Sequence, residues 1–334
     1  MQIIVVGAGV IGLASAMALL EAGHAHVTIV AESFDDTTSH VAGAIWRPFA
    51  LSKNSSTASI DRWGHATMLW LTKLMEMHGT DAVGIQRTEG REYHDEPSVA
   101  HPYWAHSVDG FRFLTREEAQ SKGALYGCAY TTLMVHPGKL LPWMRVHIER
   151  LGGRFEQRHV ASLDDLQCDV IVNCTGMGAK TLVGDTSVYP VRGQTIKVTN
   201  PAVTQFCMHE VNHVYTYILP RPGGEVVIGG TVQAHNYSTS CNQADIDAIL
   251  GRAIKLNPAV AESKIVGTKA GLRPQTATGV VLRPDPRRTR RVGTPFIEAV
   301  PKKYSNGFRV PSYDLCTDSC CTSPQCLQFR RLRR

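Results

Sequence analysis

The chain opens with MQIIVVGAGVIG, residues 1–12, in which a short apolar run passes directly into a glycine-rich turn. Apolar residues at helical spacing follow over residues 13–22, and Gly23 ends this segment. A second apolar run, residues 27–30, stops just before Glu32. The succession of strand, glycine turn, helix, strand and acid predicts a βαβ unit with two parallel strands.

The three glycines of the turn match the spacing G-x-G-x-x-G, in which each glycine has its own steric role. Gly7 permits the tight turn, Gly9 leaves room for a pyrophosphate, and Gly12 lets the helix pack closely on the strand. Val10 and Ile11 belong to the same turn and precede the N-terminus of the helix, whose unpaired N–H groups and positive dipole attract phosphate. The pattern therefore predicts a dinucleotide site, although a tight turn without any ligand is the alternative.

Glu32 follows Gly12 by twenty positions, at the end of the second strand. A carboxylate at this place accepts hydrogen bonds from the ribose hydroxyls of an unphosphorylated dinucleotide. The acid therefore favours NAD or FAD over NADP. The motif alone does not separate NAD from FAD.

The composition is that of a globular protein with a sizeable core, with 334 residues, 43% of them hydrophobic and 19% charged. The net charge of +6 is concentrated in residues 283–291 and 330–334, which lack interleaved aromatic residues. We therefore expect solvated basic segments and no nucleic-acid partner. No apolar run reaches the ~18 residues of a membrane span, and the N-terminus is a core strand rather than a secretory signal. We expect an intracellular protein with no membrane partner.

Nine cysteines fall into two groups. Five are scattered through the chain, as is typical of free thiols in a reducing compartment. The other four stand at positions 316, 320, 321 and 326, with spacing C-x3-C-C-x4-C and no histidine nearby. This spacing matches no standard zinc site, so we expect no metal.

The rest of the chain predicts a second domain inserted into the first. Helical patterns cover residues 59–78, 137–151 and 242–255, buried strands cover 168–176 and 265–274, and a hairpin joins 215–220 to 225–231. We predict an α/β protein in which a doubly wound, Rossmann-like dinucleotide domain is interrupted by a mixed antiparallel-sheet domain. The predicted ranges are 1–50, 136–188 and 268–300 for the dinucleotide domain, 51–135 and 189–267 for the inserted domain, and 301–334 for an atypical tail.

Seven short motifs occur in the order found in the flavin-dependent D-amino-acid oxidase family, which includes the D-aspartate oxidases. They lie at residues 7–12, 37–46, 172–176, 192–194, 217–220, 229–231 and 271–274. The most diagnostic is Gly-Leu-Arg-Pro at 271–274. The chain resembles this family over about residues 1–300.

The resemblance implies FAD as the cofactor and assigns further residues to it. Gly7, Gly9 and Gly12 would hold the pyrophosphate, and Glu32 the adenosine ribose. The remaining implied contacts are Thr37, Thr38 and Ser39 at phosphate or ribityl oxygens, Gly43, Ala44 and Ile45 along the flavin ring, Val160 at the end of its strand against adenine, and Thr175 and Gly176 lining the cleft.

The resemblance also implies the reaction, in which D-amino acids and oxygen give 2-oxo acids, ammonia and hydrogen peroxide. Arg273 would clamp the substrate carboxylate, because a planar guanidinium matches a carboxylate with two parallel N–H groups. Tyr217 would donate its hydroxyl to the same carboxylate, and Tyr215 would close the pocket. The alternatives are a surface arginine and a half-buried strand tyrosine.

The sequence favours neutral D-amino acids over acidic ones. D-aspartate oxidases typically place an arginine directly after Gly-Gly-Thr, and here that position is Val232. An apolar residue cannot pair with a side-chain carboxylate. D-aspartate oxidase activity stays open as the alternative, with Arg47 or His235 supplying a positive group.

The tail departs from the family pattern. Beyond about Pro301 there is no turn of the type His-x-Tyr-Gly-x-Gly, which in the family closes the FAD site. A shifted reading frame or alternative splicing is our hypothesis for this departure, and a catalytically impaired remnant is a further alternative. The family is typically peroxisomal, but no peroxisomal tripeptide ends this chain, so a cytoplasmic location is also open. A homodimer is left open as the assembly.

Overall fold

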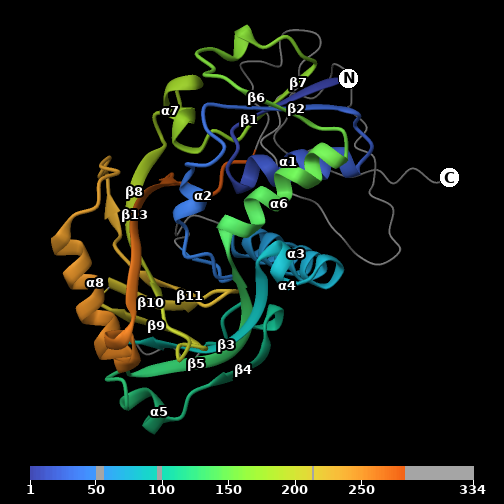
Figure 1. Cartoon of the computed structure of the whole chain (residues 1–334). Helices are drawn as coiled ribbons and strands as arrows, with labels where there is room; N and C mark the ends of the chain where they lie inside the picture. Colours follow the sequence, from blue (N-terminus) through green and yellow to red (C-terminus); the bar gives the residue numbers. More distant parts are fainter. Residues whose placement is uncertain (50–55, 96–99, 213, 283–334) are drawn as a thin grey trace. The chain divides into compact units, whose positions relative to one another are not determined.

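The computed structural model describes residues 1–49, 56–95, 100–212 and 214–282. Two sheets carry the described part of the chain, one fully parallel and one mixed (Figure 1). This combination of helices with a parallel and a mixed sheet confirms the predicted α/β class.

The parallel sheet has the strand order β6-β2-β1-β7. Its elements are β1 (Gln2–Val6), α1 (Val10–Glu21), β2 (His26–Ala31), α6 (Pro137–Arg150), β6 (Arg154–Gln157) and β7 (Val170–Asn173). Helix α6 packs beside α1. Because α1 lies between α6 and the sheet, it is apolar on nearly all sides, and Leu13, Ala16 and Met17 are buried.

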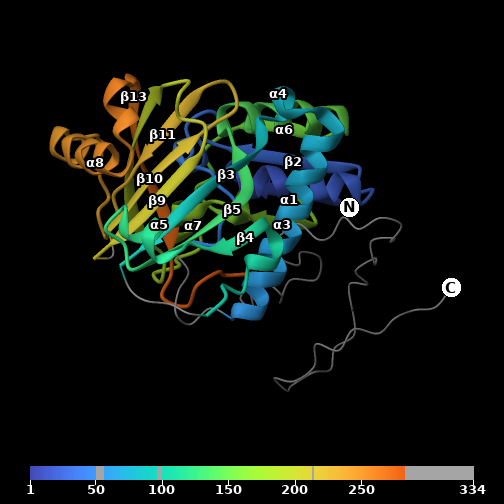
Figure 2. The same cartoon turned by 90° about the horizontal axis from the view of Figure 1, so that it is seen from below.

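The mixed sheet contains nine strands among the described residues, in the order β12-β8-β11-β10-β9-β3-β5-β4, with β13 also paired to β8. Every neighbouring pair is antiparallel except β3 with β9. Figure 2 shows several of these strands side by side. The strands are β3 (Ile85–His94), β4 (Asp109–Phe113), β5 (Tyr126–Val135), β8 (Tyr189–Thr199), β9 (Phe206–Val211), β10 (Val214–Pro220), β11 (Glu225–Gly229), β12 (Gln233–Ala234) and β13 (Lys264–Gln275).

Strand β13 runs antiparallel to β8 along its whole length. The predicted boundary at residue 268 therefore falls inside one strand of the mixed sheet, although residues 268–275 were expected in the dinucleotide domain. The domain ranges otherwise stay predictions.

Four short helices and two longer ones, α3 and α8, complete the α-helices of the described residues. They are α2 (Thr38–Val41), α3 (Thr57–His78), α4 (Thr80–Val83), α5 (Arg116–Gln120), α7 (Ala179–Leu182) and α8 (Gln243–Leu256). Ser56 caps α3 by accepting a hydrogen bond from the Ser59 N–H. The apolar periodicity of residues 59–78 predicts that Leu69 faces inward, but in α3 this side chain is 44% exposed. None of the helices in the described ranges is both long and apolar enough to cross a membrane.

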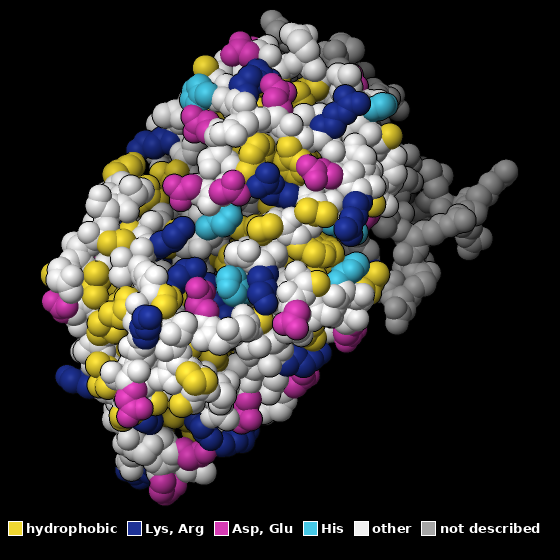
Figure 3. All heavy atoms as spheres, in the orientation of Figure 1, with side chains coloured by type: hydrophobic (Ala, Val, Ile, Leu, Met, Phe, Trp, Pro, Cys, Tyr) yellow, Lys and Arg dark blue, Asp and Glu magenta, His cyan; other side chains and the backbone are white. Residues whose placement is uncertain are grey.

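The face of the molecule seen in Figure 3 carries acidic and basic side chains interspersed with apolar ones. No single sign of charge dominates that face. The basic segments 283–291 and 330–334 lie outside the described residues.

Candidate active site

A large cavity of about 980 Å³ extends from the glycine turn after β1 to the segment 42–45. Thirteen of the fifteen residues predicted to bind the cofactor line it: Gly7, Gly9, Val10, Ile11, Glu32, Thr37, Thr38, Ser39, Ala44, Ile45, Val160, Thr175 and Gly176. Gly12 is buried under the turn, and Gly43 lines a second cavity instead. The structure therefore gathers nearly the whole predicted set around one cleft.

The backbone of the glycine turn leaves no space for side chains. Gly7 has φ +108°, and a Cβ there would overlap the carbonyl of Cys174. A Cβ at Gly12 would overlap the carbonyl of Gly7, so Gly12 is needed within the turn itself rather than for packing against the strand alone. At Gly9 a Cβ would come 3.2 Å from the Ser39 hydroxyl and project where a ligand would lie.

Several predicted polar contacts have protein partners in this structure. The Thr38 hydroxyl donates to the Leu272 carbonyl at 2.9 Å, and that of Thr175 to Asn173 Oδ1 at 2.7 Å. Ser39 Oγ accepts from the Val10 N–H at 3.0 Å. A hydroxyl has one hydrogen to donate, so Thr38 and Thr175 present acceptor lone pairs to the cleft unless they rotate.

Glu32 lies at the adenosine end of this cleft and contacts His159 Nδ1, a residue that the sequence analysis missed. The Glu32 carbonyl also accepts from Gln157 Nε2 at 3.0 Å. Val160 lines the same end, but it does not end a strand as predicted, because β6 already stops at Gln157.

The segment 42–45, hereafter the dividing wall, separates this cleft from a second cavity of about 330 Å³. Ala42, Ala44 and Ile45 line both cavities. On one side the wall is bonded to β5, since the Val135 N–H donates to the Ala44 carbonyl at 2.8 Å. Ala44 has φ +61°, an uncommon conformation for a residue with a side chain.

Arg221 anchors the other side of the dividing wall. Its Nη2 donates to the carbonyls of Ala42 and Gly43, the second at 3.2 Å, and its Nη1 donates to Glu225 Oε1 at 2.7 Å. Arg221 is 3% exposed, and burial lowers its pKa while the Glu225 carboxylate opposes that shift. From the sequence, Arg221 is predicted only to lie in a hairpin turn. The one local sign of an ion pair is Glu225, four residues later.

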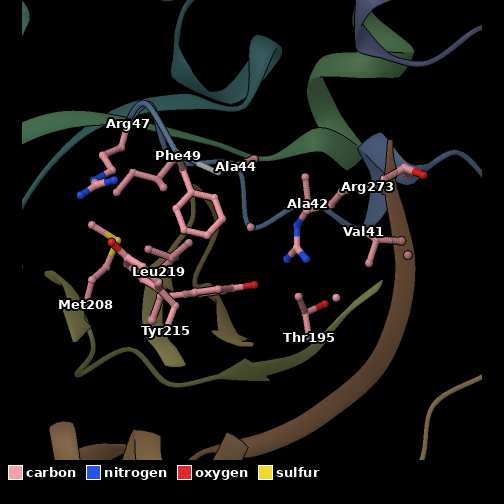
Figure 4. Close-up of a pocket in the computed structure, with 16 residues that line it drawn as sticks. Val41, Ala42, Ala44, Arg47, Phe49, Thr195, Met208, Tyr215, Leu219 and Arg273 are labelled. Carbon is pink, nitrogen blue, oxygen red and sulfur yellow. The ribbon is translucent and has the colours of Figure 1, made fainter. Parts of the chain in front are cut away.

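The second cavity holds the three predicted substrate residues, Tyr217, Arg273 and Tyr215 (Figure 4). The Arg273 guanidinium is near enough to the Tyr217 hydroxyl to act on its pKa, and Arg273 Nη1 donates to the Thr231 carbonyl at 3.2 Å. Burial raises the pKa of Tyr217, although Arg273 and Arg221 lower it in part. Tyr217 therefore keeps its proton at neutral pH and can donate it in a hydrogen bond.

Glycines on neighbouring strands make room for these two side chains. A Cβ at Gly193 of β8 would overlap the Arg273 guanidinium, and a Cβ at Gly229 of β11 would overlap the Tyr217 ring. The glycines of the motifs Arg-Gly-Gln and Gly-Gly-Thr thus leave the space that the side chains of Arg273 and Tyr217 occupy. This role was not visible in the sequence, because it depends on which strands are neighbours.

The far end of the second cavity carries Arg47, which is bonded to Glu92. Glu92 Oε2 accepts from Arg47 Nε at 3.1 Å and from the Tyr130 hydroxyl at 2.9 Å, and Arg47 Nη2 donates to Oε1. Glu92 is fully buried; burial raises its pKa, but Arg47 and His94 outweigh burial and bring the pKa to about 2. The carboxylate is therefore ionised at neutral pH.

Val232 and His235, the other two residues that bear on neutral against acidic substrates, do not line the second cavity. Val232 is 53% exposed, and His235 stacks on Tyr189 with ring centroids 4.5 Å apart. Phe49, by contrast, does line the cavity and packs edge-to-face on Tyr215, with ring centroids 4.9 Å apart.

A βαβ turn with an open cleft, joined through one wall to a cavity with an arginine–tyrosine pair, is the arrangement of a flavin-dependent oxidoreductase. The family model described as FAD dependent oxidoreductase matches residues 2–306, and the chain belongs to this family. Its cofactor is FAD. The residues present fit this cofactor, since the glycine cradle and the N-terminus of α1 line a cleft long enough to reach the dividing wall.

Curated relatives cover most of the chain. It is 35% identical over 274 residues to a D-amino-acid oxidase from Rubrobacter xylanophilus, covering 81% of this chain and 82% of the relative. It is 31% identical over 280 residues to the human D-aspartate oxidase, covering 82% and 81% respectively. The solved structure of glycine oxidase from Geobacillus kaustophilus has a TM-score of 0.73 at 22% identity, over 90% of this chain and 89% of that one, which shows a shared fold.

Proposed function

We propose that this protein oxidatively deaminates D-amino acids, with oxygen as the electron acceptor, to 2-oxo acids, ammonia and hydrogen peroxide. The single observation that carries the proposal is that Tyr217 and Arg273 together line a cavity that shares the dividing wall with the cofactor cleft. The names of the curated relatives, D-amino-acid oxidase and D-aspartate oxidase, support the same substrate class.

The two residues bind the substrate by its carboxylate. Arg273 offers a guanidinium for which no carboxylate partner exists among the described residues, so a substrate anion meets an uncompensated cation. Tyr217 adds a neutral hydroxyl donor. Because Gly193 and Gly229 seat both side chains closely, the bound carboxylate is held in one orientation and the α-carbon faces the dividing wall.

The described walls of the cavity are mostly apolar and provide no carboxylate or imidazole base. Among the described residues that line it there is no Asp, Glu or His. The α-hydrogen therefore has no nearby carboxylate or imidazole to remove it as a proton, which favours its departure as a hydride. Loss of the hydride leaves an imino acid, which water hydrolyses to the 2-oxo acid and ammonia. Bound FAD would supply the oxidant for the hydride, and oxygen would then reoxidise the flavin with release of hydrogen peroxide.

Neutral D-amino acids are the preferred substrates in this proposal, and D-aspartate is the second candidate. Arg47 is the one observation that favours the second candidate, because it brings a cation to the cavity. Its bond to Glu92 favours the first, because the pair has no net charge. The residues that decide the alternative of an impaired remnant, 301–334, lie outside the described part.

An intracellular location and a homodimer belong to this proposal as well. None of the described cysteines forms a disulfide, which supports a reducing compartment. Subcellular fractionation and the mass of the purified protein in solution test these two points.

The test is a visible spectrum of the purified protein, followed by anaerobic addition of D-alanine. We expect flavin absorbance that bleaches with D-alanine and not with L-alanine. Arg273→Lys is the matched variant, since it keeps the charge but loses the planar pair of donors, and it should bleach far more slowly. Flavin that bleaches with no D-amino acid, or with both enantiomers alike, contradicts the proposal. A colourless protein that takes up no FAD supports the impaired remnant.

A further inference from the structure

Two arginines stand at opposite ends of the substrate cavity. Figure 4 shows Arg273 at one end and Arg47 at the other, with the rings of Phe49 and Tyr215 between them. A substrate whose carboxylate lies on Arg273 therefore extends its side chain past these rings, with Met208 and Leu219 also lining the path toward Arg47.

Arg47 keeps part of its donor capacity. A guanidinium has five N–H groups. Nε and Nη2 bond the two oxygens of Glu92, and Nη1 donates to the Pro48 carbonyl at 2.7 Å. Among the described residues these bonds engage one N–H of each nitrogen, so one N–H on Nη1 and one on Nη2 are left for a ligand.

The charge of Arg47 is compensated on the side away from the cavity. The Glu92 carboxylate is fully buried and is held by Arg47, by the Tyr130 hydroxyl and by His94 Nε2 at 3.2 Å. A second carboxylate, Glu210, stands 3.6 Å from the other ring nitrogen of His94. Arg47 is therefore the cation that a substrate side chain approaches, but the negative charges of Glu92 and Glu210 at least offset its positive charge.

We propose that Glu92 is a specificity-determining residue, because it converts Arg47 from a cation into an uncharged pair of hydrogen-bond donors at the far end of the cavity. The N–H groups of Arg47 can then donate hydrogen bonds to the amide oxygen of a substrate side chain. This end of the cavity offers an acidic side chain no net attraction to offset the loss of water around the extra charge. The inference rests on the proposed function and names the side-chain class within it: D-asparagine and D-glutamine are better substrates than D-aspartate and D-glutamate.

The amide and acid pairs have nearly the same shape, so the ratio of their kcat/KM values reports charge selection alone. Glu92→Gln retains the shape of the side chain and removes its charge. We expect this variant to raise the acid-to-amide ratio on the order of 100-fold, because Arg47 then faces the substrate uncompensated. Tyr130→Phe is the matched control, since it removes one bond to Glu92 but leaves the charge, and its ratio should stay within about threefold of the wild type.

A binding measurement without turnover provides the second readout. Succinate and succinamate lack the amino group, cannot be oxidised by this reaction, and differ only in charge at one end. Their dissociation constants, measured from the change in flavin absorbance, should favour succinamate in the wild type and succinate in Glu92→Gln. Circular dichroism and bound flavin show whether each variant is folded. If Glu92→Gln does not fold, the double variant Arg47→Gln with Glu92→Gln replaces the ion pair by two amides. Because both charges are removed together, its acid-to-amide ratio should stay within about threefold of the wild type, and a large fall in the ratio would show that Arg47 acts as a net cation.

Two results would overturn the inference: a wild type that already prefers the acids, or a folded Glu92→Gln whose acid-to-amide ratios in turnover and binding do not move. Failure of the proposed function looks different. In that case no D-amino acid bleaches the flavin in any variant, whatever the two ligands do.

Discussion

The arginines at the two ends of the substrate cavity differ in their partners rather than in their chemistry. Arg273 donates to a backbone carbonyl, and no carboxylate of the described residues pairs with it. Arg47 is bonded through two nitrogens to the buried Glu92. The comparison teaches that an arginine without a counter-ion is suited to anchor an anionic group. An arginine that the protein has already paired is suited to select among side chains by hydrogen bonding.

The largest expected effect comes from removing the unpaired arginine. Arg273→Met should lower kcat/KM for every D-amino acid by roughly a thousandfold, because the substrate carboxylate loses its charged partner. Bound FAD should keep its visible spectrum, since Arg273 does not line the cofactor cleft. Steady-state kinetics with D-alanine and a flavin spectrum provide the measurement. Arg87→Met is the control, because this surface arginine pairs with Asp109. An equal loss of kcat/KM in the control would contradict a special role for Arg273.

The paired arginine should instead matter most for folding. Arg47→Met leaves the Glu92 carboxylate buried without its cation, which we expect to lower the free energy of unfolding by about 3–5 kcal/mol. The exposed pair of Arg87 and Asp109 is the comparison, and Arg87→Met should leave the unfolding midpoint in urea nearly unchanged. A midpoint for Arg47→Met equal to that of Arg87→Met would contradict a structural role for the buried pair.

The pH dependence of stability tests the same pair without breaking its geometry. Because the pKa of Glu92 is lowered from 4.5 to about 2, its pairing stabilises the fold fully above about pH 4.5. That contribution is lost as the pH falls toward 2, where the carboxylate becomes protonated. Urea unfolding across this window should show a steeper decline for the wild type than for Glu92→Gln. Parallel declines would mean that Glu92 has its ordinary pKa.

The smallest effect is expected at the dividing wall between the two cavities. Arg221→Met removes the donors to the carbonyls of Ala42 and Gly43, so the wall can shift against the flavin. We expect FAD to bind about tenfold more weakly, with a changed circular dichroism signal in the flavin bands. Lys197→Met is the control, because it removes another partner of Glu225 without touching the wall. A tenfold loss in the control as well would assign the effect to Glu225.

The parts of the site that could be predicted were those that depend on short motifs of neighbouring residues. The glycine turn and Glu32 follow from spacing, and the positions of Tyr217 and Arg273 follow from motif order. In the structure the first group lines one cavity and the second group lines the other. The contacts of Arg221 with residue 42 and of Arg47 with Glu92 join distant parts of the chain. Each requires knowing which strands are neighbours and in which register, and a single sequence does not contain that information.

Two local predictions failed for related reasons. Leu69 was assigned inward from helical periodicity, but the face of a helix that is buried depends on what packs against it. The strand before Val160 ends at Gln157, and no sequence signal marks that end. Charge compensation at Arg47 was equally invisible, because Arg47 and Glu92 are read from the sequence as two separate charges.

The dividing wall is a shared surface, and this has a thermodynamic consequence. Any displacement of Ala42–Ile45 that improves the fit of one ligand also changes the space given to the other, because the same backbone faces both cavities. Cofactor and substrate analogue are then linked, and the factor by which FAD tightens the analogue must equal the factor by which the analogue tightens FAD. A mutation that moves this backbone to fit a new substrate would therefore also change the affinity for FAD.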